Sequence, residues 1–123
     1  MSERGTIIFA ALALLIAVAA GAFGAHGLKA WVSPERLAVW QTAVLYQLVH
    51  GLALLALIAL GNRLQTSLRS KACVVMSAGI VIFSGSLYAL VLSGITVLGA
   101  ITPIGGTAFL AAWALVIWAA IKA

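Results

Sequence analysis

Long runs of apolar residues, separated by short polar segments, dominate the pattern along the chain. Windowed hydropathy predicts four such runs, at about 6–25, 37–60, 72–92 and 103–121. Each run is close to or above the ~20 residues that an α-helix needs to cross a bilayer. The runs show no alternation of apolar and polar residues, which excludes a membrane β-barrel. The pattern predicts an all-α, integral membrane four-helix bundle, with residues 1–123 forming a single transmembrane domain.

Residues that start and stop helices mark the ends of these runs. Ser33 precedes Pro34 and predicts a capped start for the second helix, which then begins outside the hydrocarbon. Thr102 before Pro103 predicts the same device for the fourth helix. Gly61 predicts the end of the second helix.

The composition agrees with a membrane protein. Apolar residues make up 65% of the chain and charged residues 7%, which is too little charge for a water-soluble surface. A disordered chain is excluded for the same reason. The net charge of +5 is spread over the short connections rather than gathered in a stripe, so no nucleic-acid partner is expected.

The distribution of cations predicts the orientation in the membrane. With four spans, one side carries five of them, Arg4, Arg63, Arg69, Lys71 and Lys122, and the other carries two, Lys29 and Arg36. The positive-inside rule then places both termini in the cytoplasm. Ala17-Val18-Ala19 resembles a signal-peptidase site, but the apolar run continues to Ala25, so we expect the first span to be kept.

Polar residues within the spans are candidates for function because they are costly at membrane depth. They fall on helix faces that can meet as one polar network, namely Tyr46, Gln47, His50, Ser84 and Tyr88. Two interpretations remain open, a structural hydrogen-bond network and a polar path for a proton or solute. No Asp or Glu lies within a span, which weakens the proton-carrier interpretation.

Two further groups of residues have expected roles. Small residues should let helices pack closely, and the candidates are Ala13, Ala17, Gly21, Gly24, Gly105 and Gly106. His26, Trp31 and Trp40 are candidates for the membrane interface. With two His and one Cys in the chain, neither a metal site nor a haem pair is expected. No cofactor motif is present.

Four motifs in order resemble the YgdD-like family, small bacterial inner-membrane proteins of unknown function. They are Gly21-Ala22-Phe23-Gly24-Ala25-His26, then Trp40-Gln41-Thr42-Ala43 with Tyr46 and His50, then Phe83-Ser84-Gly85-Ser86-Leu87-Tyr88, and Thr102-Pro103-Ile104-Gly105-Gly106 with Phe109 to Trp113. The resemblance covers nearly the whole chain. It implies four transmembrane helices, a multi-pass protein of the bacterial inner (plasma) membrane and a retained first span. It does not imply an activity.

Three functions are compatible with the sequence. The first is a non-enzymatic membrane protein that acts by self-association, as a homo-oligomer, or within a larger membrane complex. The second is a small carrier or channel that uses the polar stripes around His50 and Tyr88. The third is lipid or quinone binding in a groove near Trp31 and Trp40.

Overall fold

The computed structural model describes residues 1–123 as four long antiparallel helices. They are α1 (Glu3–His26), α2 (Pro34–Leu60), α3 (Thr66–Ser93) and α4 (Thr102–Lys122). Three short 3₁₀ turns, Leu28–Ala30, Gly61–Arg63 and Thr96–Ala100, lie in the connections. All four long helices are long and apolar enough to cross a membrane.

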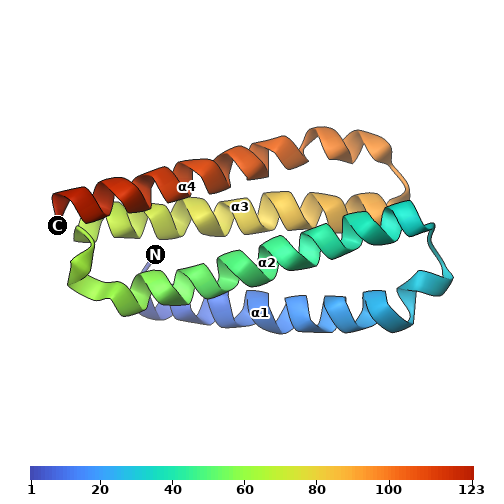
Figure 1. Ribbon diagram of the computed structural model, residues 1–123, viewed down its shortest axis with the longest axis horizontal. Helices are drawn as coiled ribbons and strands as arrows, with labels where there is room; N and C mark the ends of the chain where they lie inside the picture. The colour runs from blue at the N-terminus through green and yellow to red at the C-terminus, as the bar shows by residue number, and fades with distance from the viewer.

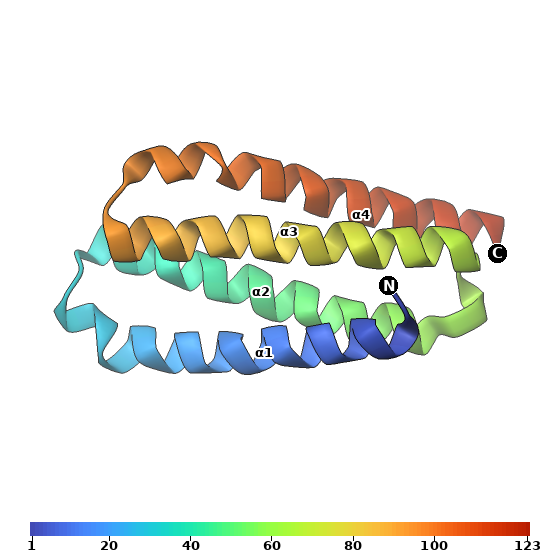
Figure 2. The same cartoon turned by 180° about the vertical axis from the view of Figure 1, so that it is seen from behind.

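The helices lie side by side in the order α1, α2, α3, α4 (Figures 1 and 2). Helix α1 packs against α2, and α4 packs against α3, whereas α1 makes little contact with α3. Both termini lie at the same end, at the left of Figure 1. The helices therefore form a layer in which chain neighbours pack most closely.

Capping residues explain most of the helix ends. Ser33 Oγ accepts a hydrogen bond from Arg36 N at 3.2 Å and starts α2, as predicted. Gly61 ends α2 with a positive φ of 57°, which also confirms the prediction. The cap predicted at Thr102 is wrong: Thr102 is already the first residue of α4, and its hydroxyl pairs with Ser86 Oγ at 2.7 Å.

Helix α3 begins six residues before the predicted start at 72. Gln65 Oε1 accepts a hydrogen bond from Leu68 N at 2.7 Å and so caps a turn that hydropathy does not detect. The polar residues up to Lys71 are thus helical rather than part of a loop. Their charged side chains make this turn too polar to score as membrane-spanning.

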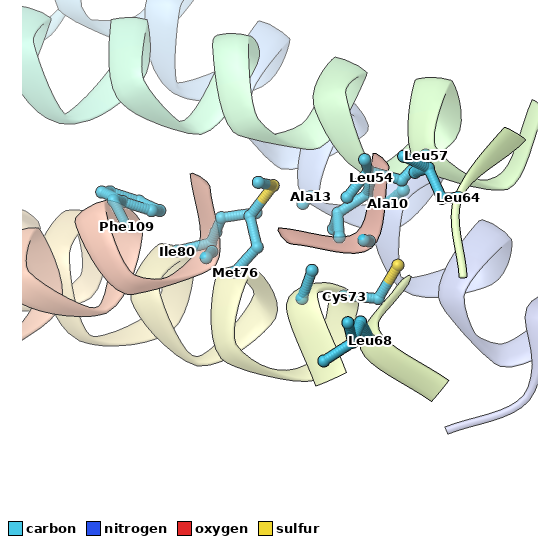
Figure 3. Close-up of a cluster of buried hydrophobic side chains, with 13 residues drawn as sticks. Ala10, Ala13, Leu54, Leu57, Leu64, Leu68, Cys73, Met76, Ile80 and Phe109 are labelled. Atoms are coloured by element: carbon cyan, nitrogen blue, oxygen red, sulfur yellow. The ribbon is translucent and has the colours of Figure 1, made fainter. Parts of the chain in front are cut away.

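A buried apolar cluster joins all four helices near the end of the molecule that carries the termini (Figure 3). Leu54 from α2 and Met76 from α3 are fully buried at its centre. Ala10 and Ala13 of α1 complete one side, and Phe109 of α4 packs at the far end. The cluster joins the four helices, and Gln47, Ser84 and Tyr88 lie farther along α2 and α3 toward the opposite end.

Candidate functional site

Glycines and alanines set how closely the helices approach. A Cβ atom on Gly105 would lie 2.7 Å from Phe83 Cα, so α4 and α3 touch through their backbones at this point. A Cβ on Gly24 would lie 2.8 Å from Trp40 Cδ1. Ala13 and Ala17 are buried on the same face of α1, and Gly21 lies against Val44. Gly106 differs, because a Cβ atom there would lie 3.9 Å from Phe83 Cδ2, an ordinary contact distance, so the packing does not require a glycine at this position.

The structure divides the residues predicted for one polar network: Gln47, Ser84 and Tyr88 form hydrogen bonds between helices, and Tyr46 and His50 do not join them. Tyr88 OH donates to Gln47 Oε1 at 2.7 Å, and Gln47 Nε2 donates to the carbonyl oxygen of Ala13 at 2.7 Å. Ser84 Oγ donates to the carbonyl oxygen of Ala43 at 2.7 Å. One amide side chain thus connects α1, α2 and α3. Gln47 and Ser84 are buried, so these bonds form away from lipid.

His50 belongs to a second set of contacts, between α2 and α4. Trp113 Nε1 donates to His50 Nε2 at 3.1 Å, and His50 Nδ1 lies 2.8 Å from the carbonyl oxygen of Tyr46. An indole N–H only donates and a carbonyl only accepts. The imidazole therefore carries its proton on Nδ1 and is neutral. Both ring nitrogens are in use within the chain.

An aromatic stack surrounds this histidine. The His50 and Phe109 rings lie 3.7 Å apart with an interplanar angle of 14°, and Tyr46 lies 4.6 Å from Phe83. These rings line a groove of about 450 Å³ between α2 and α4, together with Gly106, Thr107 and Trp113. The sequence did not predict the Trp113 contact. Its signal is the spacing of Phe109 and Trp113 four residues apart, on one face of α4.

The three candidates for the membrane interface lie in different surroundings. Trp31 is 84% exposed in the first connection, and His26 is exposed at the end of α1. Trp40 is only 5% exposed, and its Nε1 donates to the carbonyl oxygen of Ala20 at 2.8 Å. The groove expected near Trp31 and Trp40 is therefore not rimmed by both: Trp40 is a core residue that joins α2 to α1. Sequence spacing alone does not distinguish these two environments.

A separate groove lies between α1 and α3. It has a volume of about 210 Å³, and Gln47 and Ser84 lie at its floor while Leu12, Ile16 and Val81 form apolar walls. Gly85 lines it and is exposed, and a Cβ atom there would meet no heavy atom within 4 Å. Gly85 is thus a small residue at membrane depth that no helix of this chain uses for packing.

Comparison with known proteins identifies the family of this chain. Residues 20–106 match the family model described as a protein of unknown function, DUF423. The chain belongs to the DUF423 family. It is 47% identical over 116 residues to a UPF0382 membrane protein of Staphylococcus aureus, covering 94% of each chain. It is 45% identical over 117 residues to the UPF0382 membrane protein YwdK of Bacillus subtilis, covering 94% of this chain and 95% of that one.

The family supports the coarse predictions from the sequence. Its members are membrane proteins, so this DUF423 chain, with four apolar helices, is an integral membrane protein. The resemblance to an uncharacterised membrane family is confirmed at that level. No solved structure matches the chain.

Proposed function

We propose that this DUF423 protein is not an enzyme and that it acts by associating with a second copy of itself in the membrane. The hydrogen bonding of its buried polar side chains supports the first part. His50 has both nitrogens engaged, and Gln47 and Tyr88 are bonded to one another. Polar groups that are paired within the chain stabilise the fold, since an unpaired polar group at this depth is costly.

The groove at Gly85 carries the proposal of self-association. Helices in lipid associate by close packing of small residues, and Gly85 is exposed with open space above it. The same face presents Leu12 and Ile16, two large exposed side chains of α1. A two-fold contact needs a surface that is complementary to itself. Here the side chains of Leu12 and Ile16 on one copy would pack into the groove at Gly85 on the other, and the reverse.

The same proposal includes location and orientation. The protein lies in the bacterial inner membrane with both termini in the cytoplasm. The termini lie at one end of the layer (Figure 1), and that end carries the larger number of Lys and Arg side chains.

Disulfide crosslinking in native membranes tests the association. Gly85→Cys is introduced into a Cys73→Ala background, which removes the only native cysteine. Ile104→Cys is the matched control, because Ser86 pairs with Thr102 and so places residue 104 at a similar depth, on an exposed face of α4. We expect a crosslinked dimer from Gly85→Cys and none from Ile104→Cys. Equal crosslinking of the two, or none from either, contradicts the proposal.

A second candidate is binding of a lipid or quinone ring in the groove between α2 and α4. The observation that favours it is the aromatic lining, with Tyr46 and Trp113 partly exposed beside His50. Mass spectrometry of the purified protein tests it, with Tyr46→Phe and Trp113→Phe as variants. A co-purified quinone or lipid that both variants lose supports this candidate, and retention by both contradicts it.

A further inference from the structure

A cavity of about 320 Å³ lies between the start of α1 and the start of α3, at the end that carries the termini. Polar and charged groups make up much of its lining, unlike the grooves described above. The residues that line it are Met1, Glu3, Ile58, Thr66, Arg69, Ser70 and Cys73. Thr66 is the first residue of α3, so the positive end of that helix dipole lies at the cavity.

Arg69 is the unusual member of this lining. It is 8% exposed, and its guanidinium makes one contact, from Nη2 to Glu3 Oε1 at 2.8 Å. Its Nη1 is the only buried side-chain nitrogen or oxygen in the protein without a hydrogen-bond partner. An arginine has five N–H donors, and a buried cationic donor without an acceptor is costly. A partner from outside the chain would remove that cost.

We propose that this cavity binds a phosphate group, with the Arg69 guanidinium as its main donor. The planar fork of arginine matches the oxygens of phosphate better than those of a single-atom anion. Thr66 and Ser70 lie three residues before and one after Arg69, and both residues line the same cavity. Arg69 and Glu3 are the two charged side chains of the lining. This inference is independent of the proposed self-association.

Position favours phosphate over other anions. Arg69 lies before the apolar part of α3, at the depth where lipid headgroups meet water. Phosphate is present there as the headgroup of membrane phospholipids and as the free anion. The carboxylate of Glu3 competes with a phosphate for Arg69. The Glu3 side chain is 63% exposed, and it contacts the guanidinium through one oxygen only. A bound phosphate would share or replace this contact.

Thermal unfolding of the full-length protein in detergent, titrated with three probes, tests the proposal. The probes are inorganic phosphate, dioleoyl phosphatidylglycerol and dioleoylglycerol, which has the same chains without phosphate. We expect phosphatidylglycerol to raise the unfolding temperature saturably and dioleoylglycerol not to raise it. A rise with inorganic phosphate too identifies the free anion as a ligand, and a rise with the lipid alone identifies a headgroup site. No rise above dioleoylglycerol with either overturns the proposal.

Two matched pairs of variants separate the cavity from general surface charge. Arg69→Gln should weaken binding by about tenfold, the loss of a charge-assisted hydrogen bond, whereas Arg63→Gln at the same end should keep it. If Arg69→Gln does not fold, the second pair decides. Glu3→Gln removes the competing carboxylate and should tighten binding severalfold. Glu35→Gln removes a negative charge from the opposite end of the molecule and should not tighten binding. Equal effects within a pair overturn the proposal.

Discussion

The amide of Gln47 and the hydroxyl of Tyr88 are 2.7 Å apart and form a direct hydrogen bond between α2 and α3. The other end of the same amide reaches the backbone of Ala13 on α1. A single side chain thus fixes the depth of three helices relative to one another. In lipid this matters because apolar side chains can slide past each other with little change in their surroundings.

This arrangement predicts a measurable coupling between the two residues. Gln47→Leu and Tyr88→Phe should each lower the free energy of unfolding, and a double-mutant cycle should give a coupling of about 0.6 kcal/mol, the average for such bonds in membranes. Unfolding by sodium dodecyl sulfate in mixed micelles gives the values. Strictly additive effects would show that the bond contributes nothing.

A second prediction compares two glycines of neighbouring helices. Gly105→Ala puts a methyl group 2.7 Å from Phe83 Cα, where backbone must move, and should cost about 1–3 kcal/mol of stability. Gly85→Ala meets no atom within 4 Å and should leave the stability of the monomer unchanged or raise it slightly, as alanine favours a helix. The same unfolding assay measures both. Equal losses would contradict the packing described here.

The hydrogen bonds of His50 predict its tautomer. Nitrogen chemical shifts of the imidazole, measured by nuclear magnetic resonance in lipid at neutral pH, should show a neutral ring protonated on Nδ1. In Trp113→Phe the donor to Nε2 is lost, and the shift of Nε2 should move. A ring protonated on Nε2, or on both nitrogens, would contradict the contact with Trp113.

The proposed orientation predicts which positions a membrane-impermeant maleimide can reach. In a Cys73→Ala background, Trp31→Cys should be labelled in intact cells, because Trp31 is exposed in the first connection. Ser67→Cys, at the opposite end, should be labelled only after the membrane is permeabilised. The reverse pattern would place the termini outside the cytoplasm.

Hydropathy and helical spacing predict the spans and the meeting of Gln47 with Tyr88. Those features follow from local pattern, because residues four apart share a helix face and long apolar runs must be helical in lipid. The early start of α3 was not predicted, because its first turn is polar and its cap is a glutamine. The contact between His50 and Trp113 was not predicted either. It depends on how far α4 slides along α3, and the backbone contact of Gly105 with Phe83 sets that distance.

The burial of Trp40 could not be predicted from the sequence for a related reason. A tryptophan near a helix end is typical of the membrane interface. Here Gly24 removes a side chain from α1 at the same level, and the indole fills the space and donates to Ala20. The surroundings of the indole thus depend on Gly24 as well as on Trp40, and the pattern along one helix does not show a contact between two helices.

Self-association is most directly tested by energy transfer between differently labelled copies reconstituted at low protein density in lipid vesicles. The unaltered protein should show transfer that rises with protein-to-lipid ratio to a plateau. Gly85→Leu should abolish it while keeping the helical content, because a Cβ atom at this position meets no other atom within 4 Å and the larger side chain would occupy the groove that a second copy needs. Transfer no greater than expected for random proximity in the unaltered protein, or transfer unchanged in Gly85→Leu, would contradict the account.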